Sequence, residues 1–345
     1  MKNYLLPRDG QFYKANLHCH STISDGKWTA EQIKENYKQH GYSIVAYTDH
    51  QVFICHNELS DNDFLALNGY EIDISENKPW GRDTKTCHFC LIALDKDTEL
   101  QKIYCKSVHI DKNMHIARLA PDSEPFERKY DAPFISEIMK KARDEGFFVT
   151  YNHPVWSLEN VDEYLQYHGM NAMEIVNYSS YTIGYDEHNA TLYDSMLHHG
   201  EQIYCVATDD NHDVYPIGHP KSDSFGGFTM IKAEKLEYST VTQALLDGHF
   251  YASEAPQIYE LYYDSEDGCV HISTSEAVKI VMATGLRASS VVTPDADGQT
   301  VTGAAFKLDK VPADGYVRFT VRDANGKEAY TNAYRISDIL RGASK

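Results

Sequence analysis

Two histidines and an aspartate lie close together near the N-terminus, in the stretch NLHCHSTISDG at residues 16–26. The residues before it, FYKAN, read as a β-strand, and side chains two positions apart in a strand point to the same face. We therefore expect His18 and His20 to project together past the carboxyl end of that strand, followed by Asp25. Imidazole and carboxylate groups suit zinc, iron or manganese. The stretch thus predicts one side of a metal site, whereas the simpler interpretation is a strand with polar residues.

The same residue types recur in later strand-like runs. Substrate and metal sites in parallel α/β folds lie at the carboxyl ends of the strands. Each later run brings one or two candidate ligands to that end: His50 in TDH, where Asp49 precedes it, Glu71 in GYE, His88 in CHF, His153 in NHP, and Asp210 and His212 in TDDNH. A single histidine at a strand end is usually structural, but six histidines with three carboxylates exceed what one ion can bind. The set predicts a cluster of two or three metals that Glu71 is able to bridge.

The elements that must position these ligands follow a regular pattern. From residue 10 to about residue 255, short apolar runs alternate with amphipathic segments. Residues 29–41 read as a helix, with Thr29 as N-cap and Gln32 at the capping-box spacing. Residues 134–146 read as another helix that leads into a strand. This alternation predicts an α/β fold with a parallel sheet, either open or closed into a barrel.

Two segments depart from this pattern. Residues 95–133 carry dense charge between two strand-like runs, and a connection of this length is usually functional or disordered. After residue 255 the helix signals disappear, and short alternating runs predict a small all-β, sandwich-like module. We therefore expect a metal-binding domain over residues 1–254, with residues 95–133 as a charged insertion and potential lid, and an all-β domain over residues 255–345.

An anionic substrate would need cations in addition to the metals. Arg82 precedes His88, Arg118 lies in the charged insertion, and Lys221 follows the last metal motif. These are the candidates for substrate contacts, and the insertion also holds His109, His115 and Arg128. Each one alone is more often a solvated surface residue, but as a group they favour a lid role for the insertion.

The composition excludes several classes of function. The formal net charge of −19 repels a nucleic-acid backbone, so we expect no stable binding to duplex nucleic acid, although bound cations would reverse the local sign for a small anion. No apolar run is long enough to cross a bilayer and no secretory signal is visible, so we expect a cytoplasmic protein without a membrane partner. Seven cysteines, an odd number, indicate reduced thiols, and the CHFC pair lacks the second pair that a structural zinc site needs.

Taken in order, HCHSTISDG, TDH, GYE, CHF, NHP and DNH resemble the ligand motifs of the PHP (polymerase and histidinol phosphatase) metal-dependent phosphoesterases. The resemblance covers roughly residues 10–250 and implies a distorted (β/α)7 barrel. The segments YNHPVWS and HFYASEAP, with the β-rich tail, look most similar to the two-domain PHP proteins grouped with the CehA/McbA-like metallohydrolases.

The resemblance implies two to three divalent metal ions, of zinc, iron or manganese, at three positions. The first would be held by His18, His20, Glu71 and Asp210, the second by Glu71, His88 and His153, and the third by Asp25, His50 and His212. Many family members have histidine where this chain has Asp25. The third position is therefore expected to be partly filled or to prefer manganese or magnesium.

The activity that the resemblance implies is hydrolysis of a phosphomonoester or phosphodiester of a small molecule or nucleotide. A hydroxide bridging two cations would attack phosphorus. Glu71 would hold the bridged metals, His212 or His50 would act as general acid if the third metal is absent, and Asp49 would either orient a ligand or cap a helix. Two alternatives stay open: hydrolysis of a carboxylic or carbamate ester by the same cluster, and a non-catalytic metal-stabilised scaffold whose β module binds a partner.

Overall fold

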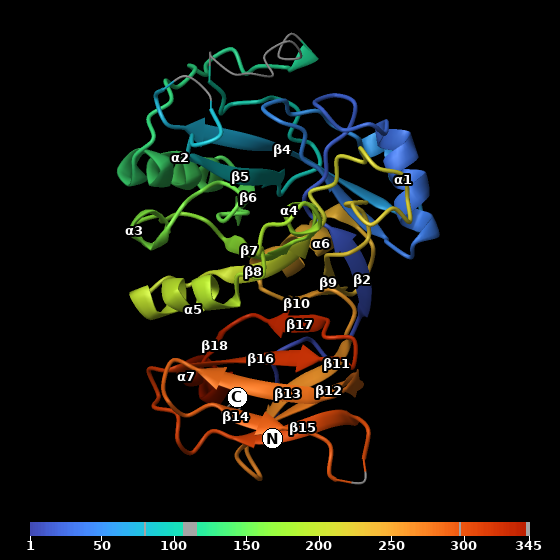
Figure 1. Cartoon of the computed structure of the whole chain (residues 1–345), viewed down its shortest axis with the longest axis vertical. Coiled ribbons are helices and arrows are strands. Elements are labelled where there is room, and N and C mark those ends of the chain that lie inside the picture. The colour runs from blue at the N-terminus through green and yellow to red at the C-terminus, as the bar shows by residue number, and fades with distance from the viewer. Residues whose placement is uncertain (79–80, 106–115, 297, 343–345) are drawn as a thin grey trace.

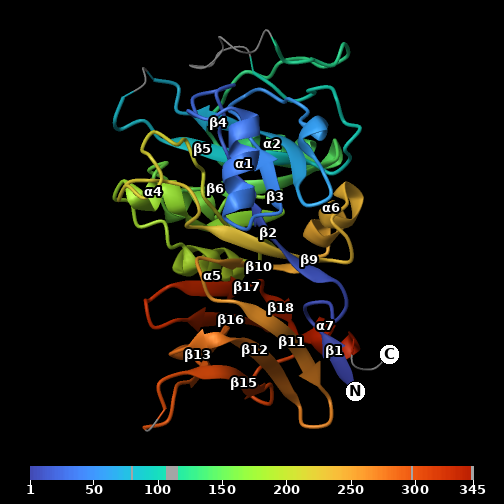
Figure 2. The same cartoon turned by 90° about the vertical axis from the view of Figure 1, so that its right-hand side faces the viewer.

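The computed structural model describes residues 1–78, 81–105, 116–296 and 298–342. Figure 1 shows an upper half that carries most of the helices above a lower half of orange and red strands. Both chain ends lie in the lower half (Figures 1 and 2). The protein is mixed α/β with a large sheet, as the sequence predicts. None of the described helices has the length and apolar character to cross a membrane.

The strands of the upper half follow one another in the large sheet in the order β10-β9-β2-β3-β4-β5-β6-β7-β8. Their bounds are β2 Gln11–Asn16, β3 Ile44–Tyr47, β4 Leu65–Ser75, β5 Thr86–Ala93, β6 Phe147–Asn152, β7 Ala172–Asn177, β8 Tyr204–Thr208, β9 Phe228–Ala233 and β10 Phe250–Ser253. Every residue of β5, β6 and β7 is buried. Strands covered on both faces read as continuous apolar runs, so a polar side chain within them needs a specific partner.

Strand direction differs from the parallel sheet that the sequence predicts. β2–β3, β3–β4, β6–β7 and β7–β8 are parallel. However, β9 runs antiparallel to β2, and β5 runs antiparallel to both β4 and β6. The connection between β4 and β5 contains no helix in the part that is described, and parallel neighbours need a longer crossover. The parallel prediction is therefore wrong for β5 and β9.

Closure into a (β/α)7 barrel stays a prediction. β8 ends the strand order of the large sheet. Within the described residues, its hydrogen bonds to β9 come from the Thr229 hydroxyl, which accepts from the Ala207 N–H at 3.2 Å and donates to the Ala207 carbonyl at 3.0 Å. β8 therefore lies beside β9, joined to it by a side chain.

The helices are short and fewer than strict strand–helix alternation requires. Thr29 and Gln32 form the predicted capping box at the start of the first helix, and the helix predicted over residues 134–146 corresponds to α2. The bounds are α1 Ala30–Gln39, η1 Asn57–Leu59, α2 Ala132–Asp144, α3 Val161–Tyr164, α4 Tyr178–Thr182, α5 Ala190–His199 and α6 Tyr238–Leu246. In Figure 1, α1 and α2 lie on opposite sides of the upper half.

The lower half consists of two strand layers around one apolar core. A four-stranded sheet, in the order β1-β11-β12-β15, faces β14, β13, β16 and β17 of the large sheet. Side chains such as Ile272 and Phe319, one from each layer, share the core between them. The bounds are β1 Lys2–Tyr4, β11 Ile258–Asp264, β12 Cys269–Ala277, β13 Lys279–Thr284, β14 Ser290–Val292, β15 Val301–Lys307, β16 Tyr316–Arg322, β17 Glu328–Thr331, β18 Tyr334–Arg335 and a final helix α7 Ile336–Gly342.

The two halves share strand pairing. β10 pairs with β17, so the large sheet continues across residue 254, and β1 from the N-terminus pairs with β11 of the lower half. The division into domains at residues 254 and 255 stays a prediction. α7 is a helix that the all-β prediction does not contain.

A buried carboxylate surrounded by tyrosines anchors the loop after β6. Glu159 accepts hydrogen bonds from the hydroxyls of Tyr151 at 2.7 Å and Tyr130 at 3.0 Å, and from Tyr167. Burial raises the pKa of Glu159 to about 7, although the three hydroxyls lower it. The loop that Glu159 closes begins with the candidate ligand His153.

We expect Glu159→Gln to flatten the pH dependence of stability. Because the pKa of Glu159 is raised from 4.5 to about 7, the folded protein keeps a proton that the unfolded chain releases within this interval. Its contribution to the free energy of unfolding therefore falls as pH rises, by at most about 3 kcal/mol. Urea unfolding between about pH 5 and pH 8 should show a smaller loss of stability in Glu159→Gln than in the wild type. The exposed Glu137→Gln is the control, and equal slopes in wild type and Glu159→Gln would contradict the prediction.

Candidate metal centre

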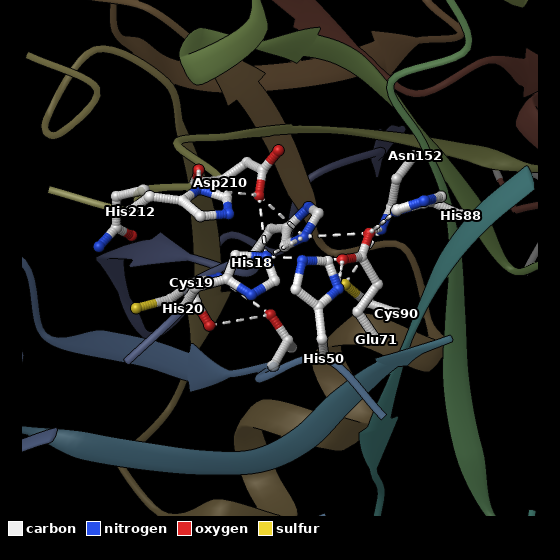
Figure 3. A network of polar contacts seen from close by, with 12 residues as sticks. His18, Cys19, His20, His50, Glu71, His88, Cys90, Asn152, Asp210 and His212 are labelled. Atoms are coloured by element: carbon white, nitrogen blue, oxygen red, sulfur yellow. Dashed lines mark hydrogen bonds and ion pairs between the residues drawn. The ribbon is translucent and has the colours of Figure 1, made fainter. Parts of the chain in front are cut away.

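His18 and His20 follow β2 and face one another in the interior of the upper half, as Figure 3 shows. Their Nε2 atoms are 3.1 Å apart. The Asp210 Oδ1 atom lies 3.1 Å from Nε2 of His18 and 3.0 Å from Nε2 of His20. We call these three residues the first cluster. The shared face that strand alternation predicts for the two histidines is consistent with this geometry, since both present the same nitrogen to one carboxylate.

Glu71 is the carboxylate that most histidines approach (Figure 3). Its Oε1 atom lies 3.3 Å from Nε2 of His18, 3.1 Å from Nδ1 of His88 and 3.3 Å from Nε2 of His153. Its Oε2 atom lies 2.9 Å from Nδ1 of His50. One oxygen thus faces the first cluster together with His88 and His153, an arrangement that fits a ligand shared between two ions.

Asp25, His50 and His212 meet at the outer edge of the site. The Asp25 carboxylate lies 3.8 Å from Nε2 of His50 and 3.6 Å from Nε2 of His212. It also lies 3.9 Å from Nδ1 of His20, so the outer group includes a histidine that also belongs to the first cluster. Asp25 has a side chain that is 43% exposed, which makes it the most open of the nine predicted ligands.

Glu71 and His88 do not lie at strand ends, where the sequence analysis places them. Glu71 lies in the interior of β4, and His88 lies near the start of β5. His88 still reaches the site because β5 runs antiparallel to β4, which brings it opposite Asp73 near the end of β4. The strand-end rule is therefore wrong for these two residues, although their side chains join the same cluster.

Two predicted ligands have a strained backbone. His153 directly follows β6 with a φ of 27°, and Asp210 follows β8 with a φ of 53°. Such left-handed conformations are uncommon for residues other than glycine, and they concentrate at functional sites where the surrounding structure enforces them.

Glu174, which the sequence analysis missed, orients the buried end of the site. The His18 Nδ1–H donates to Glu174 Oε1 at 2.7 Å, which leaves the Nε2 lone pair facing the first cluster. Glu174 also accepts hydrogen bonds from the backbone N–H of His153 and from the Thr208 hydroxyl. A carboxylate in the middle of the largely apolar strand AMEIVN was the signal that could have revealed it.

The chemistry of the donor set fits divalent cations. Glu71 Oε2 and Asp210 Oδ1 are buried and accept no hydrogen bond from the described residues, and such atoms are costly unless a cation or a donor satisfies them. Burial opposes their ionisation, but the surrounding histidines, His18 first among them, hold the pKa of both carboxyls well below the usual range. Burial, together with His50 and His212, lowers the pKa of His20 to about 4, so its imidazole is neutral at pH 7.

Asp49 holds the loop between His20 and Asp25. Its carboxylate accepts hydrogen bonds from the backbone N–H groups of Ser21 at 2.8 Å and Ser24 at 3.0 Å, and from both hydroxyls. It does not cap any described helix. These contacts fit the orienting alternative, with Asp49 acting on the loop and no contact of its own with the cavity described below.

Asp223 and Asp209 were also missed and shape the other side of the site. Asp223 accepts a hydrogen bond from the backbone N–H of His212 at 2.8 Å. Asp209 accepts from the backbone N–H groups of Phe225, Gly226 and Gly227, which fixes the return of the chain toward β9. The run TDD carried a signal for Asp209, since two acids in succession after a strand cannot both face the same cluster.

A cavity of about 710 Å³ opens over the candidate ligands. Its walls include the predicted ligands Asp25, His50, Glu71, His88, His153, Asp210 and His212. The remaining two, His18 and His20, lie beneath it. The cavity thus gives a small molecule access to the cluster.

The predicted substrate cations differ in their relation to this cavity. Lys221 lines it, and so does Lys27, which the sequence analysis overlooked in SDGK. Arg82 and Arg118 do not occur among the described lining residues, and Arg118 is paired with Glu99 on the surface. Arg128 pairs with the lining residue Asp73 at 2.8 Å.

The described parts of the charged insertion contribute no residue to the cavity wall. His109 and His115 lie outside the described residues. A lid role for residues 95–133 therefore stays a prediction.

Comparison with known proteins gave structural similarities alone. No protein-family model matches the chain, and no curated protein matches it either. A two-domain protein from Bacteroides vulgatus ATCC 8482, named as containing a predicted PHP-like metal-dependent phosphoesterase, is 16% identical over 96% of this chain and 98% of its own, with a TM-score of 0.43. A protein from Bifidobacterium adolescentis ATCC 15703, provisionally named a metal-dependent phosphoesterase, is 15% identical over 64% of this chain and 94% of its own, with a TM-score of 0.37. An amidohydrolase from Chromobacterium violaceum, with bound sulfate and no metal, is 15% identical over 57% of this chain and 87% of its own, with a TM-score of 0.34.

Proposed function

We propose that the chain is a metal-dependent hydrolase that cleaves phosphate esters of small molecules. One observation carries the proposal: the buried Glu71 carboxylate lies within 3.5 Å of ring nitrogens of His18, His20, His50, His88 and His153 at the floor of an open cavity. A purely structural metal site is closed by its protein ligands. Access from the cavity therefore supports catalysis over the scaffold alternative.

The proposed ligands fall into three groups that share Glu71 or lie beside it. The first metal is assigned to His18, His20, Glu71 and Asp210, the second to Glu71, His88 and His153, and the third to Asp25, His50 and His212. Divalent cations held there would supply Lewis-acid stabilisation of phosphoryl oxygens and an acidified water. Zinc, iron and manganese suit these mixed imidazole and carboxylate groups, and manganese or magnesium is the alternative at the third, where Asp25 supplies an oxygen ligand.

The protein's own groups bind the ester and donate a proton to its leaving oxygen. The His212 Nδ1–H donates to the Asp210 carbonyl at 2.9 Å, so Nε2 faces Asp25 and the cavity. From there His212 can donate a proton to the leaving oxygen where the third position holds no metal, and His50 is the second candidate for this role. Lys221 and Lys27 supply positive charge at the cavity wall for the phosphate oxygens.

Glu174→Gln is expected to weaken metal binding about 10- to 100-fold while leaving the fold intact, because an amide cannot hold the His18 imidazole as a carboxylate does. Competition against a chromophoric chelator measures the affinity. Glu201→Gln, an acid outside the site, is the matched control. Equal affinities for Glu174→Gln and wild type would show that this hydrogen bond does not tune the ligand.

Lys221→Ala is expected to raise the inhibition constant of inorganic phosphate about threefold to tenfold, the effect of one partly exposed charge contact. Arg82→Ala should leave this constant unchanged, since Arg82 does not line the cavity. Steady-state inhibition with both variants tests the pair. A larger effect from Arg82→Ala would contradict the assignment.

A second candidate function is hydrolysis of carboxylic or carbamate esters by the same centre. The apolar side chains of Trp156, Ile183 and Val214 in the cavity wall favour it, because they suit a substrate of low charge.

The deciding experiment is elemental analysis of the purified protein with rates for p-nitrophenyl phosphate, bis-p-nitrophenyl phosphate, p-nitrophenyl acetate and an aryl carbamate. The proposal expects bound divalent metal and a preference for a phosphate ester. Preference for the acetate or carbamate would establish the second candidate, and metal without any hydrolysis would favour the scaffold.

A further inference from the structure

One wall of the cavity is apolar, although the floor is made of charged and ligand-type side chains. The apolar and aromatic members of its lining are Trp156, Ile183, Val214 and Tyr215, which we call the apolar wall. Ile183 is 51% exposed and Val214 is 59% exposed. When a ligand covers apolar groups that are otherwise in contact with water, the burial stabilises the complex. The wall therefore indicates that part of the substrate is apolar.

Trp156 lies beside the candidate ligands, and its backbone is anchored by a buried carboxylate. Its backbone N–H donates to Glu187 Oε1 at 2.7 Å, and Glu187 is itself buried and bonded to Asn189. The indole packs edge-on against the rings of His153, with centroids 5.1 Å apart, and His88, with centroids 5.4 Å apart. The indole thus forms a fixed aromatic surface directly next to two residues assigned to the second metal.

The position of the Trp156 indole against His88 and His153 indicates where an apolar group of the substrate would be attached. Because Trp156 packs against two of the histidines around Glu71, an apolar group attached close to the ester oxygen is well placed to contact the indole. In a nucleoside monophosphate, a polar ribose separates the base from the phosphorus, so the group next to the ester oxygen is not the apolar one. The geometry thus favours an aryl or arylmethyl ester over a nucleotide.

Positive charge lies beside the outer candidate ligands and beside Tyr215 of the apolar wall. Lys27 Nζ donates to the Asp25 carbonyl at 3.1 Å, beside the outer group of candidate ligands. Lys221 Nζ lies 5.8 Å from the centre of the Tyr215 ring. The lining also contains the carboxylates Asp73 and Asp223, so Lys27 and Lys221 are the protein's own groups that could meet an anionic part of the substrate. The substrate therefore combines an anion with an apolar ring.

We infer that the substrate is an aryl or arylmethyl phosphate whose ring packs on Trp156 and Ile183. This inference rests on the proposed phosphoesterase function and narrows it to one substrate class. In the reaction, the oxygen of water forms a bond to phosphorus and the bond between phosphorus and the ester oxygen breaks. One proton of the water passes to the released oxygen. The products are inorganic phosphate and a phenol or an arylmethanol. Trp156 is a specificity-determining residue in this account, with no part in the proton transfer.

The test compares benzyl phosphate with 2-methoxyethyl phosphate, whose leaving alcohols have similar acidity. Wild-type metal-loaded protein should hydrolyse benzyl phosphate with a kcat/KM about tenfold higher or more. Trp156→Ala should remove most of this preference, and Trp156→Phe should keep it. Ile183→Asn should reduce it without disturbing the buried structure. Val161→Asn, at a similarly exposed aliphatic residue outside the cavity, is the matched control and should behave as wild type.

Calorimetric binding of phenylphosphonate and methylphosphonate provides a second readout that needs no turnover. Tighter binding of phenylphosphonate that depends on Trp156 supports the role of the apolar wall. Equal kcat/KM for the two esters, or an equal loss for both in Trp156→Ala, would overturn the inference and leave the phosphoesterase proposal standing. If neither ester nor a nucleoside monophosphate is hydrolysed, the proposed phosphoesterase function fails. Equal binding of the two phosphonates would in that case also overturn the role of the apolar wall in binding. Preference for the nucleoside monophosphate would overturn the inference directly.

Discussion

Glu71→Gln is expected to lower kcat/KM for phosphate ester hydrolysis by at least about a thousandfold. The amide has the shape of the carboxylate but no negative charge. It therefore cannot offset the charge of two cations bound near His18, His88 and His153. The same change should lower the metal content, because the first and second positions both depend on this residue. Steady-state rates and elemental analysis of the same preparation measure the two effects together.

Glu76→Gln is the matched control for this variant. Glu76 follows the same strand but pairs with Lys78 on the surface, so its loss should change neither the rate nor the metal content. A Glu71→Gln protein that keeps both wild-type metal and wild-type activity would contradict the role assigned to Glu71.

Removal of the metals is expected to abolish hydrolysis and to lower the unfolding temperature. Without cations, the buried oxygens Glu71 Oε2 and Asp210 Oδ1 have no hydrogen-bond partner among the described residues. A ligand present at a thousand times its Kd stabilises the folded state by about 4 kcal/mol, so its removal should lower the melting temperature by several degrees. Thermal unfolding and rate assays before and after dialysis against a chelator measure both.

Adding back single metals is the control for this experiment. Zinc, iron or manganese should restore both the rate and the melting temperature, which separates metal loss from irreversible unfolding. Full activity in protein shown by elemental analysis to be free of metal would contradict the account.

The candidate ligands could be predicted because parallel strands bring their carboxyl ends to one edge. That rule applies to His18, His153 and Asp210, each of which follows a strand closely. It fails for His88, which lies at the start of a reversed strand. Strand direction was not readable there, because the run TCHFCLIA has the apolar pattern of a buried strand but does not show whether the preceding connection crosses over.

Groups that support the ligands were harder to predict. Glu174 lies inside an apolar strand, and only the fold reveals that its carboxylate faces His18. Lys27 and Arg82 look equivalent as single surface cations in the sequence, and the position of their loops relative to the cavity separates them. The wall formed by Trp156, Ile183 and Val214 comes from three segments distant in sequence, so no local pattern contains it.

The same limit applies to the fold. The capping box at Thr29 and the helix around residues 134–146 depend on local residue types, and they were predictable. The pairing of β1 with β11 and of β10 with β17 depends on residues far apart in the chain. Alternation of apolar residues specifies that such strands exist but not which strand they join.

Electron paramagnetic resonance of the manganese-loaded protein distinguishes a multi-metal centre bridged by Glu71 from separate metal sites. Two manganese ions that share the Glu71 carboxylate are close enough to couple magnetically. The account predicts a spin-coupled spectrum at full loading, and its replacement in Glu71→Gln by the six-line signal of isolated ions. A wild-type spectrum that shows only isolated ions at every loading would contradict the bridged centre.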